Sequence, residues 1–208
     1  HGNYNEYRCK GDYTMTFDIP SALKALRPNA QWHMIGTEYS NIYWDDKTQT
    51  KPTEQEIEEK IAELKYQEEV NEYQEKRKSE YPDWGDQLDQ IYHSGIDVWK
   101  ANIKIIKDKY PKQTINPTEL QKRKDAAIFE LNKKNYIKAK TRLAQYELSA
   151  GVMNEDGTYS IEPLPIVITN EDGGDERNPL IVQDETEREA AQQVINQTPQ
   201  AVIDSINT

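Results

Sequence analysis

The sequence predicts a mainly α-helical protein with a small N-terminal β-hairpin, elongated long helices and an extended acidic C-terminal tail. Two long segments, 53–79 and 116–151, carry apolar residues at helical spacing between strongly charged positions. Hydrophobic residues make up 35% of the chain and charged residues 30%, whereas a typical globular domain is about 45–50% apolar. Because little apolar surface is available to offset the ordering entropy, we expect elongated parts and partner-ordered segments instead of one large core.

Charge and composition exclude several classes of protein. The net charge of -11 disfavours nucleic acid and anionic membranes as bulk partners. The sequence has no run of about 18 apolar residues, so we expect no membrane span, and its start lacks the apolar segment of a secretory signal. Cys9 is the single cysteine, which excludes an internal disulfide or a zinc site of two CxxC pairs and favours a cytoplasm-like origin. Met15 opens the segment MTFDIP, so we expect the residues before it to be an extension or a fragment edge.

Residues 1–50 are predicted to form a leader with a β-hairpin. Residues 1–18 are polar and lack helical period, which predicts coil or an edge strand. A short helix is expected over 21–26, with Ser21 as its N-cap and Pro28 as its stop. Beyond it, apolar residues alternate with polar ones on both sides of a turn at 36–41 and predict a β-hairpin: Trp32, Met34, Ile42 and Trp44.

Residues 51–112 are predicted to form a long helix followed by an aromatic helical module. Thr53 and Glu56 fit a capping box, and the helix they open extends to about residue 79. Its narrow apolar stripe suits either a coiled-coil seam or strut, or a solvated helix leaning on the module. The module, 77–112, is the most apolar part of the chain and lies between two Tyr-Pro steps. We expect two helices there, at 86–92 and 96–109, separated by Gly95, with Trp99 mostly buried in the best-packed region of the protein.

The last two segments, 113–151 and 152–208, carry opposite charges. Asn116 and Pro117 open a long basic helix that Gly151 closes. Its surplus of lysine and arginine indicates contact with acidic protein, in this chain or a neighbour, more than with nucleic acid, which would need more stacking aromatic residues. The acidic tail is predicted to hold strands at 161–170 and 180–182 and a helix at 186–206 that Pro199 interrupts. We expect the tail to stay extended and to thread along neighbouring subunits.

The chain shows no catalytic constellation, so we predict that it is not an enzyme and has no cofactor and no metal site. His93, Ser94 and Asp97 supply the residue types of a triad, but near-adjacent residues do not converge as a triad requires. Asp86 and Asp89 lie near a helix start, where the helix dipole already accounts for them. The hypothesis is instead a set of protein-interaction residues, which are the apolar side chains of the module and of the tail: Trp84, Leu88, Tyr92, Trp99, Ile103, Leu164, Ile166 and Ile168.

The module also carries a family resemblance. EYPDWGDQLDQIYHSGIDVWKANIKIIKDKYPK resembles the YP-x-x-x-DQLD…(W/Y)H…I-x-x-(V/I)-KDKYPK signature of small tail-associated proteins of tailed bacteriophages, several of which are tail assembly chaperones or tail-fibre-associated proteins. The match covers 77–112, and a weaker one spans 19–59. The matching positions are Tyr81, Pro82, Asp86, Gln87, Leu88, Asp89, His93, Lys107, Lys109, Tyr110 and Pro111. The pattern is not catalytic, and the chain departs from it by the long segment beyond residue 114.

The resemblance implies a virion structural protein of a tailed phage, an adaptor at the tail, neck or fibre base. Its implied partners are other tail or neck proteins and copies of itself, with no membrane partner. Its implied location is the virion, and the host cytoplasm during assembly. The alternative is a transient tail assembly chaperone that is not retained in the virion.

Overall fold

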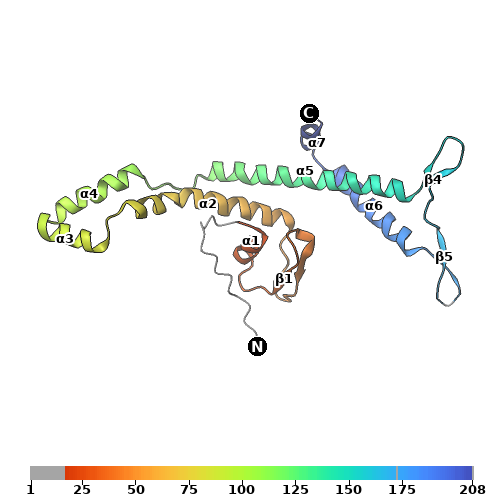
Figure 1. Cartoon of the computed structure of the whole chain (residues 1–208), viewed down its shortest axis with the longest axis horizontal. Helices are drawn as coiled ribbons and strands as arrows, with labels where there is room; N and C mark the ends of the chain where they lie inside the picture. The colour runs from red at the N-terminus through yellow and green to blue at the C-terminus, as the bar shows by residue number, and fades with distance from the viewer. Residues whose placement is uncertain (1–16, 172, 208) are drawn as a thin grey trace. The chain divides into compact units, whose positions relative to one another are not determined.

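The computed structural model describes residues 17–171 and 173–207, which contain seven α-helices and three two-stranded antiparallel sheets (Figure 1). The predicted mainly helical fold class with minor β-structure is confirmed. The chain divides into two compact units, one ending at Asp125 and the other beginning at Ala126. Every helix of the described part is too short or too polar to span a membrane. The expectations for Cys9 and for the residues before Met15 lie outside the described residues.

The buried core of the first unit lies at its N-terminal end. Helix α1 (Ile19–Leu26), strands β1 (Trp32–Met34) and β2 (Ile42–Trp44), and the first turns of α2 (Glu54–Glu80) surround it (Figure 1). Its buried residues are Ala22, Leu23, Ile42, Ile57 and Ile61. The α2 stripe predicted from the sequence therefore packs, in its first half, against α1 and the hairpin.

Local capping fixes both helices of this core. Thr53 and Glu56 form the predicted capping box, in which the Thr53 amide donates to Glu56 Oε2 at 2.7 Å and the Glu56 amide to Thr53 Oγ1 at 3.1 Å. The bonds that the Thr53 amide and hydroxyl donate to the Glu56 carboxylate lower the pKa of Glu56. The prediction that Ser21 is the N-cap of α1 is wrong. Asp18 is the cap, and Ser21 is the third helical residue that returns the bond, so the helix begins at Ile19.

The predicted N-terminal β-hairpin is confirmed. Trp32 pairs with Trp44 and Met34 with Ile42, and these four side chains belong to or pack against the core. The intervening pair, His33 and Tyr43, faces the other side and stacks with ring centroids 4.8 Å apart. Alternation along two three-residue strands is thus enough to separate a core face from an exposed face.

Beyond α2 the chain forms a helical hairpin, called the arm here, from α3 (Trp84–Ser94) and α4 (Ile96–Lys109). Gly95, at φ 82°, closes α3 and begins α4, which folds back along α3 (Figure 1). The predicted start of the first helix at residue 86 is two residues late. Asp83 is the cap, and its side chain accepts a bond from the Asp86 amide at 3.0 Å.

The prediction that 77–112 is the best-packed region is wrong. Within α3 and α4 no residue is buried, and Trp99 is only partly covered. Two short amphipathic helices cover one face of each other and leave their remaining faces in water. The buried core lies instead at the N-terminal end, where α1, the β1–β2 hairpin and α2 pack against one another.

The boundary between the two units falls within helix α5 (Pro117–Ser149), so the second unit begins with the part of α5 from Ala126 onward. It holds two hairpins, β3 (Val152–Met153) with β4 (Tyr159–Ile161) and β5 (Val167–Thr169) with β6 (Asp175–Arg177), then α6 (Pro179–Gln197) and α7 (Gln200–Ile206). The break between the last two helices confirms the predicted interruption at Pro199. The predicted strand at 180–182 is wrong, because Asn178 caps α6 and Pro179 occupies its first position.

Two hairpins are present where the sequence predicted an extended tail before its last helix, and they share one turn sequence. Asn-Glu-Asp-Gly occurs at 154–157 and again at 170–173. In each, the glycine amide donates to the asparagine carbonyl, at 3.1 Å for Gly157 and 3.0 Å for Gly173. Both glycines have a left-handed φ, 83° and 80°, a conformation that glycine adopts without the steric cost of a side chain.

Candidate docking surface

A polar clasp joins the two ends of the 77–112 segment. Arg77, near the end of α2, donates from Nε to the Tyr110 carbonyl at 2.8 Å and from Nη2 to the Lys107 carbonyl at 3.1 Å. Glu80 accepts from Tyr110 OH at 2.5 Å and forms an ion pair with Lys109. Because the last carbonyls of a helix lack partners within it, Arg77 acts as a cap for α4 while it holds that end against α2.

The clasp also shifts the titration of its own charged groups. Hydrogen bonds from Lys109 and Tyr110 lower the pKa of Glu80, and the Glu80 carboxylate raises the pKa of Lys109. Sequence reasoning missed this clasp. The signal was present, because Arg77 and Glu80 precede one Tyr-Pro step while Lys109 and Tyr110 belong to the other.

Inside the arm, one glutamine ties the two helices together. Gln87 accepts a bond from Trp99 Nε1 at 3.1 Å and donates to the Pro82 carbonyl at 2.7 Å. Ile91, Ile103 and Ile106 lie half-buried on the facing sides of α3 and α4. Trp99 and Ile103, two of the predicted interaction residues, therefore contribute mainly to holding the arm together.

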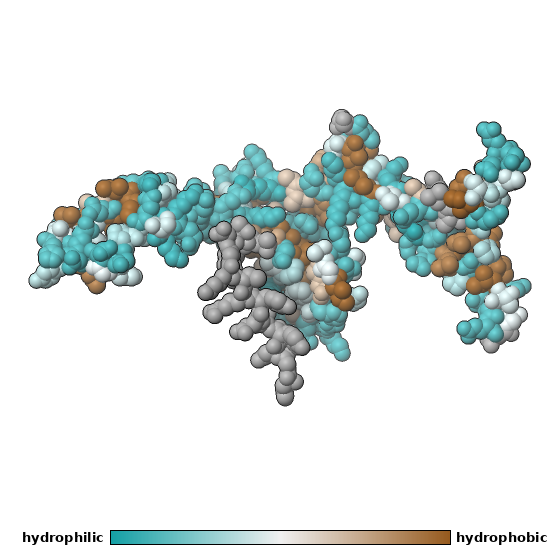
Figure 2. Space-filling view, in the orientation of Figure 1, coloured by the Kyte–Doolittle hydropathy of each residue, from teal (hydrophilic) through white to brown (hydrophobic). Residues whose placement is uncertain are grey.

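Three other predicted interaction residues form an exposed row on α3. Trp84, Leu88 and Tyr92 are 78%, 61% and 84% exposed, and their spacing of four places them on one side of the helix. This row is called the aromatic stripe. Figure 2 shows hydrophobic patches along the α3–α4 arm among hydrophilic surface. Ile96, Val98 and Ile105 add exposed apolar area on α4.

A second candidate surface belongs to the other unit. Leu164 and Ile166 line a cavity of about 240 Å³ together with Tyr146 and Ile181. Ile168 lies half-buried in β5, whose backbone pairs with β6 in the same chain, with Val167 opposite Arg177. The expectation that the tail stays extended and threads along neighbouring subunits is therefore wrong for this segment, whose strand pairs within its own chain.

The basic helix contacts the acidic tail of its own chain. Arg142 of α5 forms ion pairs with Asp184 and Glu187 of α6, both at 2.5 Å, and Arg188 lies over the Tyr146 ring at 5.2 Å. The interpretation of α5 as a partner of acidic protein is confirmed for this chain. The threading hypothesis is correspondingly corrected, since α6 returns to α5.

The residues considered for catalysis lie apart from any convergent site. His93 Nε2 is 3.6 Å from Asp89 Oδ1 on the exposed side of α3, one helical turn away. A second histidine, His33, lies outside the arm, with its Nδ1 2.8 Å from Asp45 Oδ2 in a similarly exposed pair on the N-terminal hairpin. Within residues 17–171 and 173–207, no three histidine, cysteine or carboxylate side chains are grouped as a metal site requires.

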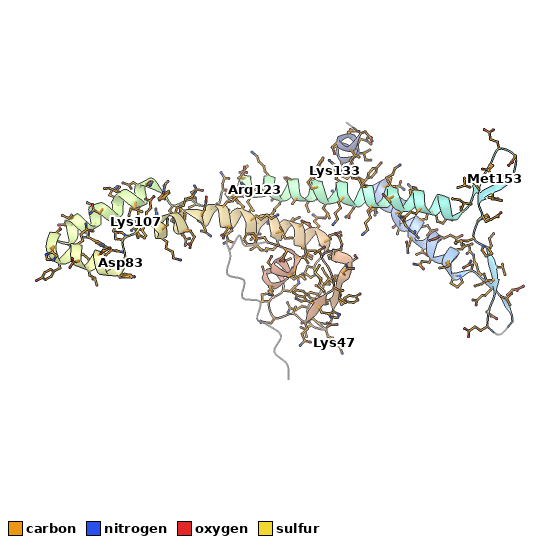
Figure 3. All side chains as sticks on the ribbon, in the orientation of Figure 1. Lys47, Asp83, Lys107, Arg123, Lys133 and Met153 are labelled. Atoms are coloured by element: carbon orange, nitrogen blue, oxygen red, sulfur yellow. The ribbon has the colours of Figure 1, made fainter. Side chains whose placement is uncertain are left out.

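Family models, curated proteins and solved structures were compared with the chain, and none matches it. The candidate surface is therefore described from the contacts and exposure of the side chains in this chain alone. It is an apolar stripe on a two-helix arm whose base is held by the clasp. Figure 3 shows Asp83 and Lys107 at that base, one from each side of the arm.

Proposed function

We propose that this chain is a structural docking protein that binds its partners through the α3–α4 arm. The observation that carries the proposal is the aromatic stripe: Trp84, Leu88 and Tyr92 remain largely exposed although the chain has few apolar residues to spare. Exposed apolar groups gathered on one face mark interaction sites in soluble proteins. Covering a side chain of this size contributes roughly 1.5–3 kcal/mol, so three of them supply a substantial part of a binding free energy.

The clasp supports the same proposal because it holds the arm in one conformation before a partner binds. A two-helix hairpin without a buried core would lose conformational entropy when it binds. Arg77, Glu80, Lys109 and Tyr110 fix the base of the arm before binding, and Gln87 fixes α3 to α4. Pre-ordering of this kind lowers the entropic cost of association.

We further propose that the setting is the particle of a tailed bacteriophage, with the chain as an adaptor at the tail, neck or fibre base. The support is the sequence resemblance over 77–112. Several of its matching positions have a definite task in the arm: Gln87 bonds Trp99, and Tyr110 bonds Glu80. A signature whose residues build a docking arm fits an assembly protein better than an enzyme.

Mass spectrometry of purified particles tests the proposal. We expect the wild-type chain in the particles, and its loss from them in a Trp84→Ser/Tyr92→Ser variant that keeps its circular dichroism spectrum. Tyr159→Ser, which alters an exposed aromatic residue outside the arm, should be incorporated normally. A wild-type chain present in infected cells but missing from finished particles would instead favour the transient chaperone.

A further inference from the structure

We infer that the partner of the arm is the arm of a second copy of this chain, with α3 of each copy lying along α4 of the other. The inference rests on the proposed docking function and names the partner of that same surface. It follows from the distribution of charge between the two helices, the exposed apolar faces they leave, and the net charge of the rest of the chain.

The two helices of the arm have opposite charge. Helix α3 and its cap carry three acids and no lysine or arginine, namely Asp83, Asp86 and Asp89. Helix α4 carries four lysines against two aspartates: Lys100, Lys104, Lys107 and Lys109 against Asp97 and Asp108. A surface that is negative along one helix and positive along the adjacent one is complementary to itself after a two-fold rotation.

The charges needed for such pairing are accessible. Lys100 lies 3.9 Å from Asp97, and Lys104 is paired with Asp108, both on the exposed side of α4. Exposed pairs within one helix contribute little to stability. These lysines can therefore exchange their partners for Asp89 of a second arm at little cost, while Asp86, on the other side of α3 from Leu88, adds to the negative charge of that helix.

The positions of the exposed side chains favour the same arrangement. On α4 the exposed Ile96 shares one side of the helix with Lys100, Lys104 and Lys107. On α3 the aromatic stripe is left uncovered by α4. Two such hairpins can cover each other's open faces as a four-helix bundle, in which each helix has two neighbours instead of one.

The net charge explains why two copies would meet at the arm and not elsewhere. The whole chain has a net charge of -11, so most pairs of surfaces on two copies repel. Residues 83–109 contain five aspartates and four lysines, which makes the arm nearly neutral. The arm is thus a place where apolar contact between copies is not opposed by like charge.

A charge exchange on the full-length chain tests the inference, with mass in solution followed by sedimentation equilibrium. We expect the wild type to form a dimer. We expect Asp86→Lys/Asp89→Lys and, separately, Lys100→Glu/Lys104→Glu to raise the dimer Kd at least about tenfold, because each now opposes like charges in both halves of the interface. An equimolar mixture of the two variants should dimerise again, since both halves are complementary in the mixed pair.

The control is Glu72→Lys/Glu75→Lys, which makes the same change of charge with the same spacing on the exposed side of α2. It should dimerise at least as well as the wild type and should not rescue Lys100→Glu/Lys104→Glu. A wild type that stays monomeric up to about 100 µM, or a dimer that both arm variants leave unchanged, would overturn the inference. Failure of Trp84→Ser/Tyr92→Ser to alter incorporation into particles would instead count against the proposed function, so the two failures are distinguishable.

Discussion

Replacing Arg77 by methionine should release the base of the arm without unfolding the protein. The substitution keeps most of the aliphatic stem but removes two charged hydrogen bonds, to the Tyr110 and Lys107 carbonyls, and the cation–π contact with Tyr73 at 4.8 Å. Hydrogen bonds from a charged group are worth about 1.5–3 kcal/mol each when well shielded, and an exposed cation–π contact about 0.5–1 kcal/mol. Because Arg77 is only half-buried, we discount the sum to roughly 1–3 kcal/mol.

Native-state hydrogen exchange measures this loss directly. A change of 1–3 kcal/mol in local opening corresponds to about 5- to 150-fold faster exchange of the protected amides in α4, with the N-terminal core unchanged. The control is Lys78→Met, which removes only an exposed pair with Glu75 at 3.7 Å and should leave α4 exchange as it is. Equal exchange rates of α4 in both variants would refute the role assigned to the clasp.

Three further outcomes follow from the contacts of individual residues. Leu23→Ala, which empties the centre of the N-terminal core, should cost about 2–5 kcal/mol of unfolding free energy in urea titration, and Leu88→Ala on the exposed stripe should cost far less. Asp46 should titrate at a pKa of about 2 by NMR, because Thr48, Gln49 and Gln31 donate hydrogen bonds to it. Its folded pKa is below the unfolded value of 3.8, so its contribution to stability is present above that value and is lost as the pH falls towards 2; Asp46→Asn should lack this part of the pH dependence. Gly157→Ala, at a left-handed φ of 83° with open space for the added methyl, should weaken the β3–β4 hairpin by roughly 1–2 kcal/mol, seen as faster exchange of the Asn154 amide.

Local signals in the sequence predicted the boundaries of several elements correctly. Thr53 with Glu56, Gly95, and Asn116 with Pro117 each mark a helix end through bonds or backbone angles that involve neighbouring residues only. The hairpin at Trp32 and Trp44 was predictable for the same reason. The fold class could therefore be inferred from short-range rules.

The errors came from properties that depend on distant residues. The 77–112 segment is the most apolar in the chain, but apolar content does not say which faces another element will cover, and no residue of α3 or α4 is buried. The strand expected at 180–182 was an ambiguous apolar run, and the Asn178–Pro179 start signal that resolves it was overlooked. The two Asn-Glu-Asp-Gly turns are four residues long and were not recognised as a repeat, so the hairpins they close were missed.

The same separation between core and arm explains how a chain with few apolar residues can both fold and bind. The residues that stabilise the first unit, Leu23 and Ile57 among them, are gathered in one small core. The arm depends on polar bonds at Arg77, Glu80 and Gln87 and on a few half-buried apolar side chains. The aromatic stripe is left unused for folding. Trp84 and Tyr92 are then available to the proposed partner, and their replacement should weaken that binding without removing the fold. A protein that used those residues in its own core would lose the exposed aromatic surface of the arm on which the proposed docking depends.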